Sequence, residues 1–350
     1  MNSGEKIDIK GLESREIEQW VNSQGLETYR ARQIYEWAFR KLAGSFQDMT
    51  NIPKDVRTLL EKKANLSPCE RVKLEVSKDG TQKTLFRLKD GHLIESVLIP
   101  ERGHDTICIS TQVGCAMGCR FCLTGRQGLK RNMTAGEILD QVVQVKRSMD
   151  DPERLTNVVL MGMGEPLANL DAVIKAVGNL ISEEGMNFSH RKVTLSTCGL
   201  VPQIQALGKR VTVNLAVSLN AAGDKTRSFL MPVNRKYPLN RLIPACKAFP
   251  LPNRRMITFE YILIQGINDR EDDALRLIRL LSGMRAKINL IPLNAFPGLD
   301  MFPPSKEKIQ HFQNILLENH FTAIIRKSKG QDISAACGQL SGEAENDLSL

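Results

Sequence analysis

From about residue 106 onward, short apolar runs of β-forming residues alternate with helical patterns, and this alternation constrains the fold more than any other feature. The six runs are Thr106 to Ser110, Asn157 to Met161, Val193 to Ser196, Thr212 to Ser218, Thr258 to Ile264 and Lys287 to Ile291. Helical spacing fills the intervals, as with Ile138, Val142 and Val145 after the helix-starting Thr134. Alternating strands and helices form a parallel sheet, because each crossover returns the chain to the same direction. We therefore predict an α/β fold in which six strand-helix units curve into a partial barrel.

The first hundred residues follow two other patterns. Apolar residues recur at helical spacing before Gly25 and again before Gly44, which predicts two short amphipathic helices. Their apolar positions are Ile17, Trp20, Val21, Ala31, Ile34, Tyr35 and Ala38. From residue 71 to 100 the turn pairs Asp79-Gly80 and Asp90-Gly91 separate β-rich runs, which predicts an antiparallel meander. We expect a helical unit over residues 1–70, a meander over 71–100, a core barrel over 101–332 and a tail over 333–350.

Three cysteines follow the first barrel strand within eight residues: Cys115, Cys119 and Cys122. Three thiolates on one short loop can hold three irons of a cubane cluster while the fourth iron stays open to a ligand, as a catalyst requires. A zinc loop completed by a distant residue and a set of buried thiols without a role are the alternatives. Structural zinc prefers paired Cys-x2-Cys hooks, and no second pair is present. The loop therefore predicts a radical-generating enzyme.

Small, polar and acidic residues follow the other predicted strands. They are the run Gly162-Met163-Gly164-Glu165-Pro166, the pair Ser196-Thr197, the run Ser218-Leu219-Asn220 and Asn294. The carboxyl ends of parallel strands share one edge of a sheet, where such folds place their chemistry. Gly162 and Gly164 would let backbone approach a ligand, and Glu165 could accept hydrogen bonds from an ammonium group. Plain loop geometry is the alternative for this glycine-rich turn.

The chain is basic, with 48 Lys and Arg against 39 Asp and Glu, a net charge of +9 and a pI near 9.1. This excess favours a polyanionic partner. Several basic residues adjoin the predicted chemistry: Arg126, Lys130, Arg131, Arg191, Lys192, Arg326, Lys327 and Lys329. Such residues would hold phosphates there, while an ordinary solvated charged surface is the alternative.

Compartment follows from apolar patterning and cysteine usage. The first ten residues lack the apolar core of a signal peptide, and no stretch is long enough to span a bilayer. Eight cysteines in 350 residues are too sparse for a disulfide framework. An oxygen-sensitive cluster also needs a reducing compartment, so we expect a cytoplasmic protein without membrane partners.

Four runs of the sequence resemble the RlmN family, in a match that covers nearly the whole chain. They are Gln112 to Cys115, Met161 to Leu167, Leu195 to Thr197 and Asp332 to Leu340. These enzymes are radical S-adenosylmethionine (SAM) methyltransferases that act on carbon 2 of an adenine in 23S rRNA and, in some members, in tRNA. The resemblance implies a radical SAM barrel in which Cys115, Cys119 and Cys122 bind a 4Fe-4S cluster. It implies SAM contacts at Gly164, Glu165, Ser196, Ser218, Leu219, Asn220 and Asn294.

The resemblance also implies a mechanism with two SAM molecules per turnover. Carbon 2 of adenine is electron-poor and the SAM methyl group is electrophilic, so polar transfer between them lacks a nucleophile. In the family's scheme, Cys337 first takes a methyl group from one SAM, and a radical generated from a second SAM then activates that methyl group for addition to the base. Glu95 matches the family's proton acceptor, and Cys108 matches the thiol that frees the RNA through a transient disulfide with Cys337. Either Glu95 or Cys108 could take the carbon 2 proton.

The residues themselves allow other interpretations of these three positions. Glu95 is a carboxylate within an apolar strand, where burial would make it a useful base, whereas an edge strand would expose it to water. Cys108 lies in the middle of a predicted strand and could be an inert buried thiol. Cys337 lies in a segment with little hydrophobic pattern, which predicts a flexible segment and an accessible thiol. Arg326, Lys327 and Lys329 could stabilise its thiolate, while Cys69, Cys198 and Cys246 match no motif and are interpreted as packing residues.

The resemblance extends to partners. The N-terminal helices, with Arg30, Arg32, Arg40 and Lys41, would help to grip RNA as the family's accessory domain does. Their rings, Trp20, Tyr29, Tyr35 and Trp37, are more often core residues than stacking platforms at this spacing. The target base must leave its stack, so RNA loops are favoured. We expect a monomer that receives electrons from a donor such as flavodoxin or ferredoxin.

Two alternatives from the sequence remain. The related Cfr-type enzymes share both cysteine motifs but methylate carbon 8 of adenine, and Pro166 favours carbon 2. A non-enzymatic zinc RNA-binding module would instead hold zinc and leave SAM intact.

Overall fold

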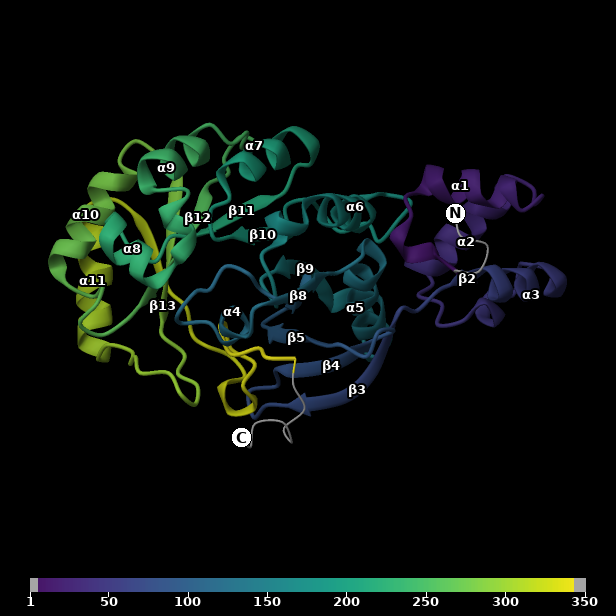
Figure 1. Cartoon of the computed structure of the whole chain (residues 1–350), viewed down its shortest axis with the longest axis horizontal. Helices are drawn as coiled ribbons and strands as arrows, with labels where there is room; N and C mark the ends of the chain where they lie inside the picture. The colour runs from purple at the N-terminus through teal and green to yellow at the C-terminus, as the bar shows by residue number, and fades with distance from the viewer. Residues whose placement is uncertain (1–5, 343–350) are drawn as a thin grey trace.

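A ten-stranded sheet forms the centre of the computed structural model, which describes residues 6–342 (Figure 1). The strands lie in the order β14-β13-β12-β11-β10-β9-β6-β5-β4-β3. The parallel strands are β6 (His104–Cys108), β9 (Leu155–Leu160), β10 (Val193–Thr197), β11 (Asn214–Ser218), β12 (Ile257–Leu263), β13 (Ala286–Pro292) and β14 (Thr322–Ile325). The antiparallel strands beside β6 are β5 (Leu93–Glu101), β4 (Gln82–Leu88) and β3 (Cys69–Val76).

The parallel half confirms the predicted α/β partial barrel, since all six predicted strands are present as β6 and β9 to β13. Strand β14 is a seventh parallel strand that the sequence did not reveal. It has four residues at the edge of the sheet, and Thr322 and Ile324 are exposed. A short, half-exposed edge strand gives too weak an apolar pattern to be recognised.

Helices cover the outer face of the parallel half and wrap around it (Figure 1). They are α5 (Ala135–Arg147), α6 (Leu170–Ile181), α7 (Val201–Arg210), α8 (Asp224–Leu230), α9 (Leu239–Lys247), α10 (Glu271–Leu281) and α11 (Lys306–Glu318). Helix α5 illustrates how the sequence determines where a helix begins and which face it buries. The Thr134 hydroxyl accepts the Glu137 N–H, and the Glu137 carboxylate accepts the Thr134 N–H in return, so the helix begins there. Its predicted apolar face, Ile138 and Val142, is fully buried.

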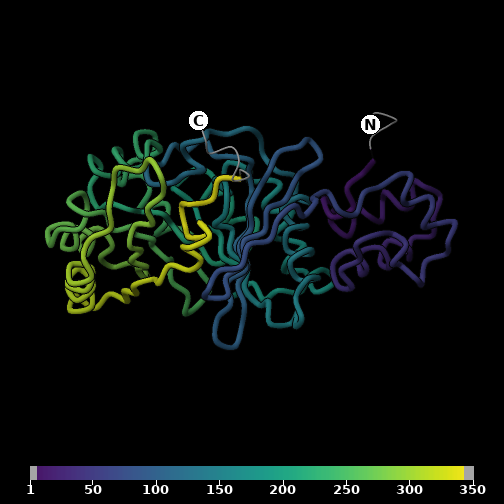
Figure 2. The backbone as a smooth tube through the Cα atoms, turned by 90° about the horizontal axis from the view of Figure 1, so that it is seen from below, coloured from purple at the N-terminus to yellow at the C-terminus, as the bar shows by residue number. Residues whose placement is uncertain are grey.

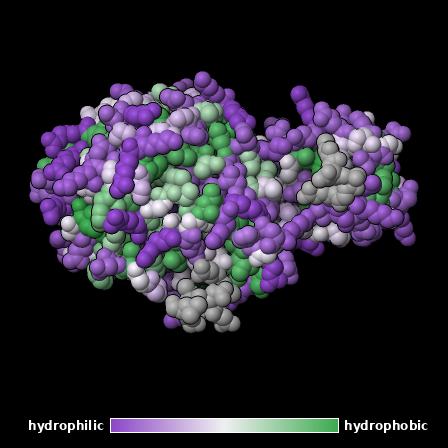
Figure 3. Space-filling model, in the orientation of Figure 1, coloured by the Kyte–Doolittle hydropathy of each residue, from purple (hydrophilic) through white to green (hydrophobic). Residues whose placement is uncertain are grey.

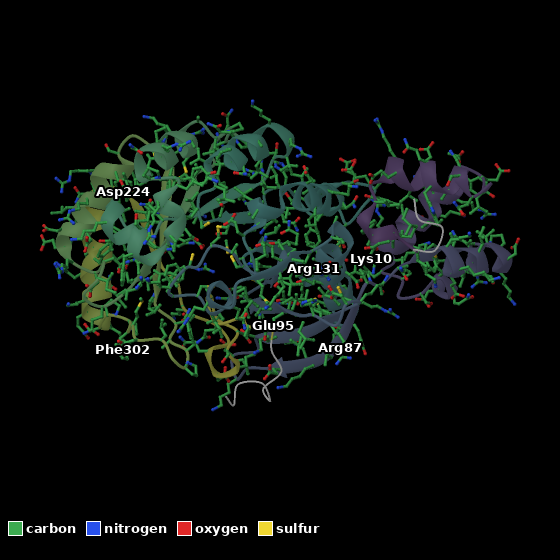
Figure 4. All side chains as sticks on the ribbon, in the orientation of Figure 1. Lys10, Arg87, Glu95, Arg131, Asp224 and Phe302 are labelled. Carbon is green, nitrogen blue, oxygen red and sulfur yellow. The ribbon has the colours of Figure 1, made fainter. Side chains whose placement is uncertain are left out.

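The N-terminal helices form a separate lobe at one end of the elongated molecule (Figure 1). They are α1 (Ser14–Ser23), α2 (Tyr29–Phe39) and α3 (Lys54–Lys63). The first two match the predicted helices. The sequence analysis missed α3, because six of its ten residues are charged and only Leu60 is buried. The lobe is tied to the barrel by an ion pair between Lys10 and Asp140, both fully buried, at the junction seen in Figure 4. Strand β1 (Ile7–Asp8) pairs with β2 (Ala64–Asn65) and closes the lobe.

The predicted meander is present as β3, β4 and β5, and it continues the central sheet. Gly80 (φ +85°) and Gly91 (φ +86°) occupy the two hairpin turns. Strand β5 pairs antiparallel with β6, so the same sheet runs from the meander into the barrel. Within residues 6–342, no helix is both long enough and apolar enough to cross a bilayer. The face shown in Figure 3 is largely hydrophilic, and most of its apolar residues lie on the larger lobe.

The C-terminal segment after β14 returns across the molecule and lies beside the meander strands (Figure 2). Asp332 accepts hydrogen bonds from the Ser77 hydroxyl (2.5 Å) and the Lys78 N–H (3.1 Å) in the β3–β4 turn. Asp79 of the same turn accepts the Gly330 N–H (3.2 Å). We call residues 330–342 the tail segment. Residues 343–350 of the predicted tail lie outside the described part of the chain.

Candidate active site

A cavity of about 140 Å³ opens at the carboxyl ends of the parallel strands, and all three motif cysteines line it. We call it the cysteine cavity. Cys115 follows β7 (Gln112–Gly114), which pairs with β8 (Leu129–Asn132) in a small hairpin. Gly114 (φ +74°) is required there, because a Cβ atom would lie 1.9 Å from the Gly128 carbonyl oxygen. Cys122 directly precedes α4 (Leu123–Gln127).

The three thiols fit an iron-sulfur cluster by the chemistry of their donors, because cysteine thiolates are the ligands that such clusters take. Burial raises the pKa of Cys115 to about 12 and raises those of Cys119 and Cys122. Metal binding therefore has to displace protons from all three. Among residues 6–342, no three His, Cys, Asp or Glu side chains are grouped so that they could hold a single metal ion.

Glu165 enters the cysteine cavity from the glycine-rich loop after β9, and only 4% of its surface is exposed. Its carboxylate accepts the N–H groups of Cys198 (2.8 Å) and Leu167 (3.0 Å). Burial raises the pKa of Glu165 above its usual value, and these hydrogen bonds oppose the rise. Gly164 (φ +101°) packs on Gln112, whose Cβ would lie 2.5 Å from an added Cβ. The glycine is thus needed for contact with the cysteine hairpin, a reason that the sequence analysis did not foresee.

Most of the other predicted SAM residues line the cysteine cavity, and one of them lies behind its wall. Ser196, Ser218 and Asn220 line the cysteine cavity together with Gly164 and Glu165. Leu219 is fully buried and is not among the lining residues, although its N–H donates to the Glu260 carbonyl (2.9 Å). The Asn220 side chain is also held, because its oxygen accepts the Ile262 N–H (2.8 Å).

A second cavity, of about 460 Å³, lies along the inner faces of the barrel strands. We call it the barrel cavity. Cys108, the last residue of β6, lines it together with Arg326 and Asn294. Four residues line both cavities: Met161, Glu260, Ile291 and Cys337. The structure therefore brings Cys337 together with the cysteine loop on one side and with Cys108 on the other.

Cys337 is exposed, as the sequence predicted. The tail segment that carries it is not flexible as predicted, because hydrogen bonds fix it to the barrel. Asn294 donates to its carbonyl oxygen (3.1 Å), and the next residue, Gly338, accepts the Leu123 N–H (2.8 Å). Surrounding protein raises the pKa of Cys337 to about 11 by desolvation, the Glu260 charge adds to this, and Arg326 opposes it. Arg326 is the predicted cation, and it lowers the pKa of Cys337 by less than desolvation raises it. The thiol is therefore protonated near neutrality.

The remaining two predicted catalytic residues occupy different surroundings. Cys108 is buried, and burial followed by the Cys337 charge raises the pKa of its thiol well above the usual value. Glu95 lines neither cavity and is only 2% exposed. Its strand, β5, lies between β4 and β6, so the edge-strand alternative is wrong. All eight cysteines, which lie within residues 6–342, are free thiols.

Glu95 holds the tail segment in place. Its carboxylate accepts the N–H groups of Ser341 (2.7 Å) and Gly342 (3.0 Å) and lies 3.2 Å from the Lys83 ammonium nitrogen. Figure 4 shows Glu95 close to the end of the tail. A proton would therefore have to compete with these N–H groups and with the Lys83 ammonium for the Glu95 carboxylate.

Two residues that the sequence analysis did not select for this site also line it. Cys198 lines the cysteine cavity beside Glu165, whereas it was interpreted as a packing residue. Glu260 lines both cavities. The sequence did contain a signal for Glu260, because a carboxylate within the apolar run Ile257 to Leu263 is unusual. The same kind of signal identified Glu95 as a candidate.

Some of the predicted basic residues are engaged within the fold, whereas others line the barrel cavity. Arg131 binds both oxygens of Glu137 (2.8 Å each) and also Asp90, so its guanidinium is committed within the fold. Lys327 and Lys329 line the barrel cavity with Arg326. In the N-terminal lobe, Tyr35 is buried as expected for a core ring, but Tyr29 is 54% exposed.

Comparisons with known proteins agree with this geometry. Residues 109–278 match the Radical SAM superfamily, and residues 7–66 match the ribosomal RNA large subunit methyltransferase N-terminal domain. The chain is 54% identical to the dual-specificity RNA methyltransferase RlmN of Geobacter sulfurreducens, over 97% of this chain and 93% of that protein. It is 53% identical to the same enzyme of Geotalea uraniireducens, over 97% of this chain and 98% of that protein.

A solved structure also matches. The crystal structure of a radical SAM methyltransferase from Sphaerobacter thermophilus is 47% identical and has a TM-score of 0.93, covering 96% of this chain and 100% of that one. Together the barrel and its three-cysteine cavity define a radical SAM enzyme, which uses a 4Fe-4S cluster and SAM. The chain belongs to the RlmN family and is an RNA methyltransferase.

Proposed function

We propose that this enzyme methylates carbon 2 of an adenine in 23S rRNA and in tRNA, with Cys337 as the methyl carrier. The observation that supports this most directly is that Cys337 lines both the cysteine cavity and the barrel cavity. A carrier thiol has to meet a methyl donor and later a second reactive group. The position of Cys337 at the shared wall meets both needs without a large movement of the barrel.

Residues around the cysteine cavity bind and orient the cofactors. Cys115, Cys119 and Cys122 hold the cluster, which when bound supplies the electron that cleaves SAM. SAM is bound by Gly164, Glu165, Ser196, Ser218, Leu219 and Asn220. Asn294 acts through the tail segment, because it lines the barrel cavity and donates to the Cys337 carbonyl.

Residues around the barrel cavity release the product. Cys108 forms a transient disulfide with Cys337 as the bond between Cys337 and the RNA breaks. The carbon 2 proton passes to Cys108 or to Glu95. Of the two, Cys108 shares the barrel cavity with Cys337, whereas Glu95 lines neither cavity and its carboxylate already accepts the Ser341 and Gly342 N–H groups.

The N-terminal lobe, residues 1–70, serves as the RNA-binding accessory domain, and Arg30, Arg32, Arg40 and Lys41 contact the phosphate backbone. Residues 71–100 link it to the radical SAM core of residues 101–332, and residues 333–350 carry the methylated cysteine. The enzyme works as a cytoplasmic monomer and takes electrons from a donor such as flavodoxin or ferredoxin.

The decisive experiment is Cys337→Ala in anaerobically reconstituted enzyme with RNA, SAM and reductant. RNA methylation should fall below detection, while iron content and SAM affinity stay at the level of the unsubstituted enzyme. Cys246→Ala, which removes a buried thiol on α9 away from both cavities, is the matched control and should methylate normally. Methylated RNA from the Cys337 variant would refute the carrier role.

Three further measurements test the release step and separate the alternatives. Mass spectrometry of the modified nucleoside should place the methyl group on carbon 2, and a carbon 8 product would assign the Cfr-type reaction. Cys108→Ala should accumulate protein covalently attached to RNA. Purified protein with zinc in place of iron and sulfide, and without SAM cleavage, would support the RNA-binding module.

A further inference from the structure

Glu260 faces the interior of the barrel and has no role in the scheme above. On strand β12, Ile257, Phe259, Tyr261 and Leu263 are at most 1% exposed. The Tyr261 ring packs on Phe312 of α11, with ring centroids 5.5 Å apart, so this face of the strand meets the helices. Side chains alternate along a strand, which turns Glu260 to the opposite face, where it lines both cavities.

Strand pairing places Glu260 beside the segment that we propose binds SAM. It lies opposite Ser218 of β11 and opposite Asn289 of β13. Its carbonyl oxygen also accepts the N–H groups of Leu219 (2.9 Å) and Asn220 (3.3 Å). Glu260 therefore shares the cysteine cavity with Cys337 and with the residues that we propose bind SAM.

The charged and titratable groups that face Glu260 come from neighbouring elements. They are Arg326, Lys287, Cys108 and Cys337, with the Asn289 amide as a hydrogen-bond partner. Burial raises the pKa of the Glu260 carboxyl, and Arg326, Asn289 and Lys287 oppose the rise. Within residues 6–342, no basic group forms an ion pair with it at 4 Å or less. Glu260 is therefore a stronger base than a surface carboxylate.

Methylation of Cys337 needs such a base. A cysteine thiol is mostly protonated near neutrality at its ordinary pKa of about 8.5, and only a thiolate is a good nucleophile toward a sulfonium methyl group. Once SAM fills the cysteine cavity, the proton needs an acceptor inside the protein. Of the carboxylates lining the cysteine cavity, Glu165 already accepts two backbone N–H groups, which leaves Glu260.

We propose that Glu260 is the general base that removes the proton of Cys337 as its sulfur attacks the SAM methyl group, an inference that rests on the carrier role of Cys337. The S–H bond breaks and its proton passes to a Glu260 carboxylate oxygen. The sulfur electron pair forms the new S–CH₃ bond. The pair of the old methyl–sulfonium bond stays on the sulfur of departing S-adenosylhomocysteine. No electron is gained or lost, so the step needs no reductant.

Glu260→Gln tests this in reconstituted enzyme given SAM but neither RNA nor reductant. Mass spectrometry of the peptide that contains Cys337 measures the rate of S-methylation. We expect Glu260→Gln to slow the step by about a hundredfold or more at pH 7, the range that general bases contribute. Calorimetric SAM affinity should be unchanged, and Glu260→Asp should restore part of the rate. Glu271→Gln, the same change at an exposed site on α10, should match the unsubstituted enzyme.

A neutral alkylating agent separates the base from a merely electrostatic role. The Glu260 charge raises the pKa of Cys337, so Glu260→Gln should make that thiol more acidic. Without SAM, iodoacetamide should then alkylate Cys337 of the variant at least as fast as in the unsubstituted enzyme. Methyl transfer from SAM should nevertheless be slower. An electrostatic role alone would accelerate both reactions and would overturn the proposal.

The remaining outcomes are distinct. If Glu260→Gln methylates Cys337 at the unsubstituted rate, Glu260 is not the base, and the carrier role of Cys337 is untouched. If the variant loses SAM binding, Glu260 is a SAM ligand and the proposal is wrong. If the unsubstituted enzyme never acquires a methyl group at Cys337, the carrier role itself fails.

Discussion

The parallel and antiparallel halves of the central sheet contribute to the active site in different ways. Strands β9 to β13 end at the cysteine cavity, and their inner faces supply small or polar groups such as Ser196 and Ser218. Strands β3 to β5 supply no residue to that cavity. They and their β3–β4 turn instead hold the tail segment: Ser77 donates to Asp332 of the tail, while Asp79 and Glu95 accept tail N–H groups. The parallel half thus builds the cofactor site and contacts Cys337 through Asn294, while the antiparallel half holds both ends of the tail segment that carries Cys337.

The two halves also use different physical devices. In the cofactor half, buried side chains accept backbone hydrogen bonds from nearby loops. The Glu165 carboxylate, for example, accepts the N–H groups of Cys198 and Leu167. The tail-holding half relies on carboxylates that accept N–H groups from a distant segment, supported by the Lys83 ammonium at Glu95. Substitutions in the first half should therefore damage SAM binding, and those in the second should loosen the tail while SAM binding persists.

Glu165→Ala should have the largest effect, in the cofactor half. It leaves two buried N–H groups without an acceptor, at a cost of about 1–3 kcal/mol each. Calorimetry should show SAM affinity reduced by more than about tenfold, and thermal unfolding should occur at lower temperature. Glu165→Gln keeps one acceptor oxygen and should lose less. Unchanged SAM affinity in the alanine variant would remove Glu165 from the cofactor site.

Lys83→Met should come next, in the tail-holding half. It leaves Glu95 buried without its cation, and breaking a buried pair costs about 3–5 kcal/mol, less here because Lys83 is 11% exposed. We expect faster trypsin cleavage at Arg326, Lys327 and Lys329, measured by mass spectrometry. SAM affinity should be retained.

Lys73→Met is the control for this change, since its ion pair with Glu75 is more exposed and should contribute at most about 1 kcal/mol. Equal cleavage of the Lys73 and Lys83 variants would mean that Glu95 does not hold the tail. Loss of SAM binding in the Lys83 variant would break the division between the two halves.

The sequence predicts the cofactor half better than the tail-holding half, for a physical reason. Parallel strands buried on both faces are continuous apolar runs, and the residues after them must share one edge, so Cys115, Glu165 and Ser218 could be grouped without a structure. The lobe helix α3 and edge strand β14 lacked such patterns and were missed.

Contacts between segments far apart in the chain could not be inferred from local patterns. Glu95 and Ser341 are separated by 246 positions, and no periodicity links them. The same holds for Cys337, whose accessibility was predicted but whose raised pKa depends on desolvation and on Glu260 across the cavity. Burial and charge at a site are properties of the assembled fold, which a single segment does not specify.

Acidification should give the smallest effect, at the exposed end of the tail-holding half. The Ser77 hydroxyl lowers the pKa of Asp332 below 3.8. At Asp79, burial alone would raise the pKa, but hydrogen bonds from Thr81 and the Gly330 N–H lower it to about 2. A carboxyl group whose pKa is lower in the folded state stabilises the fold fully above its unfolded pKa and loses this as pH falls through its folded pKa.

The contribution of Asp332 and Asp79 to tail docking should accordingly be constant above about pH 5, weaken as the pH drops below 3.8 and be lost towards about 2. Hydrogen exchange of the Ser334 to Gln339 amides at a series of pH values, corrected for intrinsic exchange, measures this. Asp332→Asn should dock more weakly at pH 7 and respond less to acid, because its side chain has no proton to gain. If tail protection in the unsubstituted enzyme did not change between pH 5 and 2, Asp332 and Asp79 would not be what holds the tail. The contrast between the two halves would then rest on Glu95 and Lys83 alone.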